Sequence, residues 1–137
     1  MDIWRRVGLV LSIVGLADAV YLLSDSLFPK FVKVVCPSSG IIDCGAVTSS
    51  PFSRIDHIPV ALLGTLFFVS MIAIILIDKP SFYLLMIPIW ISGVAFACYL
   101  IIAELFFIHA ICPYCTLAHV LAISIGLPVF KLALGSE

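Results

Sequence analysis

The sequence predicts an all-α membrane protein, a four-transmembrane-helix bundle with a long first loop on the extracytoplasmic side. Of the 137 residues, 64% are hydrophobic and only 11% are charged, whereas about a quarter of the residues in soluble domains are charged. The mean hydropathy is +1.30. The apolar residues form four runs, each long enough to cross the ~30 Å hydrocarbon core of a bilayer as a helix. This composition excludes a soluble globular enzyme.

We expect the four helices at about residues 7–27, 58–77, 82–107 and 112–134, with a polar loop at 28–57. Arg5 and Arg6 precede the first run, as in a signal peptide. That run is long for the apolar region of a signal peptide, however, and no small-residue cleavage pattern follows it cleanly. We therefore expect it to be retained as a helix. The four helices use most of the chain, so residues 1–137 are predicted to form one domain.

The orientation signal in the positive charges is weak, because both sides of the predicted bundle carry them. Arg5, Arg6, Lys79 and Lys131 would lie on one side, and Lys30, Lys33 and Arg54 on the other. Arg5 and Arg6 adjoin the first helix, which usually dominates orientation. Both termini are therefore expected on the cytoplasmic side. With an even number of spans, the loop at 28–57 and the turn before residue 112 then share the outer side.

Two cysteine pairs fall on that outer side. Cys36 and Cys44 lie in the polar loop, while Cys112 and Cys115 belong to a Cys-Pro-Tyr-Cys sequence that opens the last helix. In a Cys-x-x-Cys motif the two sulfurs can close a small ring, and a helix N-terminus stabilises the thiolate needed for disulfide exchange. Disulfides persist outside the cytosol. The cysteines therefore predict redox chemistry on the extracytoplasmic face.

The prolines, acidic residues, lone cysteine and small residues inside the apolar runs also have expected roles. Pro88 and Pro128 should kink their helices. Asp18 and Glu104 would be costly in lipid, so both are functional candidates, and Cys98 is interpreted as a packing residue. Small residues should allow close helix contacts: Gly15, Ala17, Gly64, Gly93, Ala95, Ala97 and Gly126.

These features together resemble the vitamin K epoxide reductase family over almost the whole chain. The resemblance rests on four spans, a Cys-x7-Cys loop after the first helix, Ser50 six positions beyond Cys44, and a Cys-x-x-Cys that opens the fourth helix. It also includes a Pro-x-x-Leu-Leu-Gly sequence from Pro59 to Gly64. Each piece alone is common, but their ordered combination is specific.

The resemblance implies an electron relay. Cys36 would exchange disulfides with a separate thioredoxin-fold, DsbA-like partner, Cys44 would pass electrons to Cys112, and Cys115 would reduce a quinone. Ser50 and His119 would contact that quinone. Similar prokaryotic members make protein disulfides, so the expected location is a prokaryotic cell membrane. Many of them carry a fused thioredoxin-like domain, whereas this sequence ends at Glu137. The partner is therefore expected to be another polypeptide.

Two residues depart from the animal enzymes of the family. His119 stands where those enzymes carry a tyrosine, and Val60 stands where they carry an asparagine. These departures favour ubiquinone, menaquinone or a related quinone over vitamin K epoxide. Another bacterial quinone-linked disulfide generator also has four helices, but its two cysteine pairs occur in the reverse order.

Two other classes of protein remain possible from the sequence. One is a structural tetraspan protein whose loop is stapled by a disulfide. The other is a metal-handling membrane protein that uses thiols and imidazoles as ligands, although no Met-rich or His-rich tract accompanies the cysteines. We expect no metal site and no nucleic-acid partner. A change in the redox state of Cys115 with quinone would distinguish the redox interpretation from both.

Overall fold

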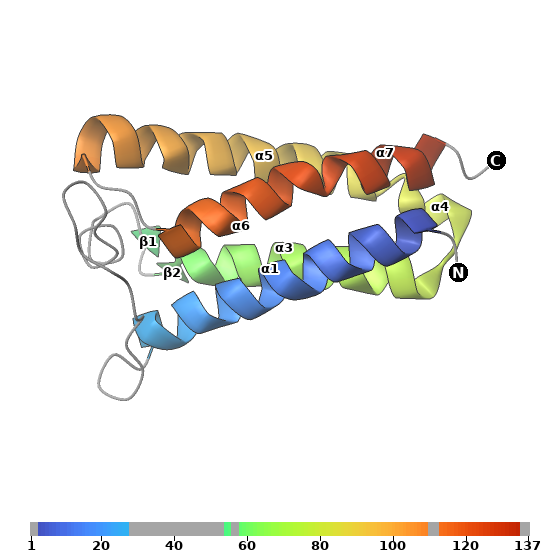
Figure 1. Cartoon of the computed structure of the whole chain (residues 1–137), viewed down its shortest axis with the longest axis horizontal. Helices are drawn as coiled ribbons and strands as arrows, with labels where there is room; N and C mark the ends of the chain where they lie inside the picture. Colours follow the sequence, from blue (N-terminus) through green and yellow to red (C-terminus); the bar gives the residue numbers. More distant parts are fainter. Residues whose placement is uncertain (1–2, 28–53, 56–57, 110–112, 135–137) are drawn as a thin grey trace.

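The computed structural model describes residues 3–27, 54–55, 58–109 and 113–134. Their elements are arranged as a bundle of long helices with a two-stranded antiparallel sheet at one end (Figure 1). The helices are α1 (Ile3–Leu27), α3 (Val60–Ile77), α4 (Pro80–Tyr83), α5 (Met86–Ile102), the π-helix η2 (Ala103–Ile108), α6 (Pro113–Ser124) and α7 (Gly126–Leu134). The two strands are β1 (Arg54–Ile55) and β2 (Ile58–Pro59).

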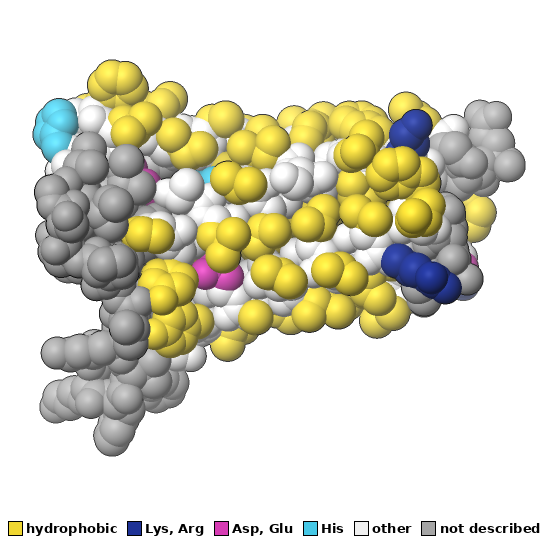
Figure 2. Space-filling model, in the orientation of Figure 1, with side chains coloured by type: hydrophobic (Ala, Val, Ile, Leu, Met, Phe, Trp, Pro, Cys, Tyr) yellow, Lys and Arg dark blue, Asp and Glu magenta, His cyan; other side chains and the backbone are white. Residues whose placement is uncertain are grey.

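Four helical stretches are long and apolar enough to cross a membrane: Ile3–Ser24, Val60–Ile77, Pro80–Ile108 and Pro113–Leu134. Figure 2 shows hydrophobic side chains along the middle of the bundle and Lys and Arg side chains at the end that carries both termini. A lipid-facing surface requires this distribution. The all-α, four-helix membrane fold is thus confirmed, and the chain is an integral membrane protein.

The helix ends differ from the expected ones at three places. The first helix begins at Ile3, about a turn earlier than expected. The second begins at Val60, because Ile58 and Pro59 pair as a strand with Arg54 and Ile55. The third begins at Pro80, whose fixed φ angle and missing N–H suit the first position of a helix.

The last two spans are each interrupted a few residues before the proline that was expected to kink them. Pro88 has no N–H to offer to the carbonyl of Leu84, and the third span changes from α4 to α5 at Leu84 and Leu85. Pro128 has the same effect on Ser124, where α6 gives way to α7. The bonds on either side of this second break remain, with Ile125 N–H to Leu121 O at 3.0 Å and Val129 N–H to Ile125 O at 2.9 Å. Each interruption therefore costs little more than one backbone hydrogen bond.

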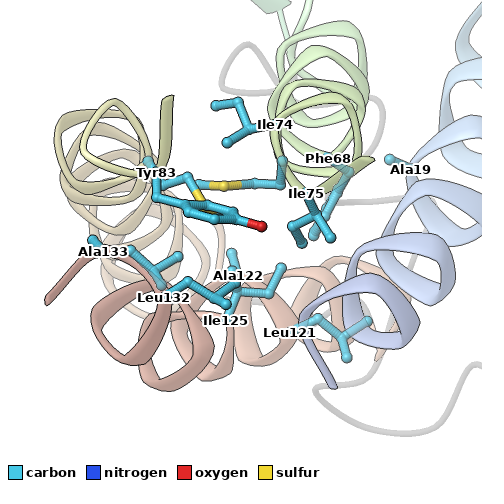
Figure 3. Packing of buried hydrophobic residues seen from close by; sticks show 13 residues of the cluster. Ala19, Phe68, Ile74, Ile75, Tyr83, Leu121, Ala122, Ile125, Leu132 and Ala133 are labelled. Carbon is cyan, nitrogen blue, oxygen red and sulfur yellow. The ribbon is translucent and has the colours of Figure 1, made fainter. Parts of the chain in front are cut away.

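The buried core lies between α3, α4, α6 and α7, towards the end with the termini. In Figure 3 the ring of Tyr83 extends into this core, between Ile75 on α3 and Leu132 on α7. The largest side chains that are fully buried are Phe68, Met71, Ile75, Met86, Ile125 and Val129. Dispersion contacts among such side chains drive helix association in lipid, where the hydrophobic effect between helices is absent.

A polar cluster joins three elements at the same end of the bundle. Arg5 Nη2 donates to the carbonyl of Ile75 at 2.9 Å, and its Nε lies 3.3 Å from Asp78 Oδ1. Tyr83 donates its hydroxyl to the same carboxylate oxygen. Asp78 has a φ of 55° and ends α3 in the left-handed conformation. Arg5 thereby satisfies a carbonyl in the last turn of α3 that would otherwise lack a partner.

Glycines allow aromatic rings to pack between the helices. A Cβ at Gly15 would lie 2.3 Å from the Phe68 ring, and one at Gly126 would lie 2.4 Å from the Trp90 ring. The expectation that small residues allow close helix contacts is confirmed at Gly15 and Gly126. It is wrong for Ala17 and Ala95, which are exposed on the outer surface of the bundle.

We predict that Gly15→Ala will destabilise the protein by about 1–3 kcal/mol, because the fully buried Phe68 ring would have to move. The matched control is Gly64→Ala, where the added Cβ would meet only Ala19 at an ordinary 3.8 Å. Denaturation in detergent, followed by circular dichroism, measures both variants. Equal stability of the two variants would contradict this account of α1–α3 packing.

Candidate functional site

Cys115 lies in the first turn of α6, at the end of the bundle opposite the termini. Figure 1 shows α6 beginning at the same end of the bundle as β1 and β2. The described part of this helix starts at Pro113. His119 follows Cys115 by four residues, so the two side chains share one face of α6, about one turn apart. Both line the same internal cavity.

This cavity has a volume of about 520 Å³ and lies among α1, α3, α5 and α6. Its lining is mostly apolar. It includes Ala19 and Leu22 from α1, Val60, Leu63, Gly64, Leu66, Phe67 and Phe68 from α3, Ile89, Gly93, Phe96, Ala97 and Leu100 from α5, and Ala118 and Ala122 from α6. A pocket of this size and character suits a small aromatic or terpenoid molecule.

Few polar groups face this cavity. Ser70 and Ser92 belong to its lining, but each donates to the carbonyl four residues earlier in its own helix, at 2.7 and 2.9 Å. The reactive side chains that remain on the lining are the thiol of Cys115 and the imidazole of His119. The cavity thus brings one sulfur and one imidazole into an otherwise apolar space.

His119 is only 7% exposed, and its Nδ1 has no hydrogen-bond partner. A buried polar atom without a partner is costly and is usually retained for function. His119 therefore carries an unsatisfied polar atom on the wall of the cavity.

Some residues of the cavity wall on α3 and α5 are also exposed on the bundle surface. Leu63 and Leu66 belong to the cavity lining, yet they are 38% and 54% exposed on the outer surface. Ser92, across from them on α5, is also exposed. An apolar molecule dissolved in the bilayer could therefore reach Cys115 and His119 without crossing water.

The other expected site residues are placed as follows. Cys36, Cys44, Ser50 and Cys112 lie outside the described residues. Cys98 is exposed on α5, does not line the cavity and makes no disulfide with any described residue. Glu104 is 5% exposed and belongs to the π-helix η2, directly after the cavity-lining Ala103. Such π-helical turns often occur near functional sites.

Sequence reasoning missed most of the cavity wall on α3 and α5. Gly93 and Ala97 were interpreted only as close-packing residues, whereas both line the cavity. Because they are four residues apart, Gly93 and Ala97 lie on the same face of one helix. The sequence did not show whether another helix or a ligand would pack against that face. Phe67, whose ring lies over Gly93, gave no signal of its own.

Within the parts of the chain that the structure describes, no three His, Cys, Asp or Glu side chains are grouped so that they could hold a metal ion. The geometry described above is that of a multi-pass membrane protein with a thiol at the head of an apolar internal cavity.

Comparison with known protein families agrees with this class. Residues 6–129 match the model of the vitamin K epoxide reductase family. The chain belongs to this family, and it is thus a membrane oxidoreductase. A search of curated proteins gave no match.

Proposed function

We propose that the protein passes electrons from a thioredoxin-fold partner to a quinone and so supports disulfide formation. Electrons enter at Cys36 and Cys44, pass to Cys112 and Cys115, and leave on a quinone bound in the cavity. The observation that carries the proposal is the cavity itself, in which Cys115 and His119 face an apolar space whose wall on α3 and α5 is partly exposed.

The chemistry requires a meeting point between a water-soluble dithiol and a lipid-soluble acceptor. Oxidising a dithiol releases two electrons and two protons as the sulfur–sulfur bond forms, and a quinone that takes up both becomes a quinol. Cys115, at the start of α6, can reach both the water edge and the cavity. The exposed part of the wall on α3 and α5 would let the quinone and its apolar tail come from the bilayer.

His119 supports quinone reduction through its imidazole, whose buried Nδ1 has no partner among the described residues. As electrons arrive, negative charge develops on a quinone oxygen, and a hydrogen bond from the imidazole would stabilise that charge. Such a charge-assisted hydrogen bond is worth roughly 1–3 kcal/mol. Serine at position 50 remains a proposed quinone contact on the resemblance alone.

Both departures from the animal enzymes fall on the cavity wall. Val60 presents an apolar side chain where an asparagine would offer an amide, and His119 replaces a tyrosine hydroxyl. The cavity therefore favours ubiquinone, menaquinone or a related quinone over vitamin K epoxide.

The proposed relay works on the extracytoplasmic face of a prokaryotic membrane, in one domain formed by residues 1–137. Arg5, Arg6, Lys79 and Lys131 all belong to the end of the bundle that carries the termini, which supports a cytoplasmic position for that end (Figure 2). The cysteine end would then face the oxidising compartment.

We expect Cys115→Ala to abolish quinone reduction by a small membrane-permeant dithiol, because only the helix pair can deliver electrons to the cavity. Cys98→Ala is the matched control and should keep full activity, since Cys98 is exposed on α5 away from the cavity. Quinol formation measured spectrophotometrically in proteoliposomes tests both variants. Quinone reduction by the Cys115→Ala protein would disprove the proposed function.

Ala97→Phe should raise the KM for a short-chain ubiquinone by about tenfold, because one buried ring would fill part of the cavity. Ala97 is 4% exposed and lines the cavity. Ala95→Phe makes the same change two residues away on the exposed surface of α5 and should leave the KM unchanged. If both variants keep a normal KM, the quinone binds elsewhere.

The loop cysteines should matter most for a protein substrate. Cys36→Ala or Cys44→Ala is expected to slow oxidation of a thioredoxin-fold protein much more than oxidation of a small permeant dithiol, which can reach Cys112 and Cys115 directly. Thiol trapping with a mass-tagged maleimide follows both reactions. Equal losses with the two reductants would mean that the loop pair is not a shuttle.

A further inference from the structure

Asp18 is a buried carboxyl that the relay described above leaves unused. It is 8% exposed, and its Oδ2 has no hydrogen-bond partner among the described residues. An acidic side chain inside a membrane span is costly and is rarely kept without a role. The next residue, Ala19, and Leu22 one turn further along α1 both line the cavity.

The depth of Asp18 follows from the way α1 packs against the last span. These two segments run antiparallel (Figure 1). Three contacts fix their register: the rings of Tyr21 and Tyr114 lie 5.4 Å apart, a Cβ on Gly8 would lie 3.3 Å from Pro128, and Lys131 Nζ lies 5.6 Å from the Trp4 ring. Moving one residue towards the N-terminus of α1 thus corresponds to moving about one residue towards the C-terminus along α6 and α7.

By this register, Asp18 lies at the level of Leu117 and Ala118. That level falls between Cys115 and His119, the two reactive groups on the cavity wall. Ala118 itself lines the cavity, and its side chain is a single methyl group. Asp18 Oδ2 and His119 Nδ1 are therefore two buried, unpartnered polar atoms at nearly the same depth.

We propose that Asp18 is a positioning residue that holds a proton for quinone reduction and passes it through His119. The inference rests on the proposed function and assigns this residue its part in it. The Asp18 carboxylate takes up one of the two protons that the Cys112 and Cys115 dithiol loses. As the sulfur–sulfur bond forms and the electron pair moves to the quinone, that proton moves through the His119 imidazole to one reduced oxygen. The other proton of the dithiol goes to the second oxygen, which completes the quinol, and Asp18 is a carboxylate again.

The charged and titratable groups around Asp18 allow this role. Helix α3, which packs against α1, contains none between Val60 and Ile77. The last span contributes Tyr114, Cys115 and His119 near this level, and Lys131 opposite Trp4 at the far end. On α1 itself, Arg5 and Arg6 lie at that far end too, and Tyr21 and Asp25 lie towards the other. Among the described side chains, no Lys or Arg reaches the level of Asp18 to fix it as an ion pair.

The test compares Asp18→Asn, Asp18→Glu and the control Ser12→Ala in proteoliposomes, with a permeant dithiol and a short-chain ubiquinone. Ser12 is also fully buried on α1 with an unpartnered hydroxyl, but it lies nearly two turns away. Asp18→Asn should lower kcat by about a hundredfold, as expected on loss of a proton-transfer group. In this variant the KM for quinone should stay unchanged and the thermal unfolding midpoint should not fall. Asp18→Glu and Ser12→Ala should retain most of the activity.

Two further measurements separate proton transfer from a structural role. The solvent deuterium isotope effect on kcat should increase in Asp18→Asn, because proton delivery becomes limiting. In the His119→Phe background, adding Asp18→Asn should cause no further loss, because both residues serve one path.

A normal kcat in Asp18→Asn, or additive losses in the double variant, would overturn the inference while leaving the proposed function intact. Failure of the wild-type protein to reduce quinone would instead overturn the proposed function.

Discussion

The inability of lipid to hydrogen-bond a protein chain is the constraint on which the rest of this structure depends. It requires helices across the membrane, because only they satisfy the backbone within one segment. It also governs the polar side chains: Thr65, Ser70 and Ser92 donate to carbonyls of their own helices. Ser12, Asp18 and His119 are exceptions among the described residues, since each keeps a buried atom without a partner, and of these three only Asp18 and His119 can take up or release a proton. In such surroundings an unsatisfied group is costly, so these two residues indicate where reactivity resides.

The bundle divides into a packed half and a hollow half. Near the termini, Tyr83, Ile75, Ile125 and their neighbours fill the space between the helices (Figure 3), and Arg5 links α1 to the end of α3. Nearer the cysteine end, small residues on α5 and α6 leave the cavity. The packed half contributes contacts that hold α1 in register with the last span, such as Gly8 near Pro128 and Lys131 near the Trp4 ring. The hollow half is then free to admit a ligand beside Cys115.

Much of the fold could be predicted because membrane helices are specified locally. Length and hydropathy gave the four spans, and Pro88 and Pro128 predicted kinks in the last two, since a missing N–H breaks a helix in any surroundings. The strand pair before α3 was not predicted, because two residues carry no periodic pattern. The small residues were ambiguous for a related reason: Gly15 receives a ring from α3, Ala97 lines a cavity and Ala95 faces outwards. Composition alone does not distinguish these three positions.

The sequence by itself determined the membrane fold, the candidate redox residues and the spacing that sets Cys115 and His119 on one helical face, because each of these depends on neighbours within a few residues. Only the tertiary structure decided that this face borders a cavity about 520 Å³ in volume and that some of its wall on α3 and α5 is exposed. It also set the register of α1 against the last span, which gives the depth of Asp18. These features depend on the register between helices far apart in the chain. That register is set by the fit of particular side chains, such as Phe68 against Gly15 and Tyr21 against Tyr114, which no local pattern encodes.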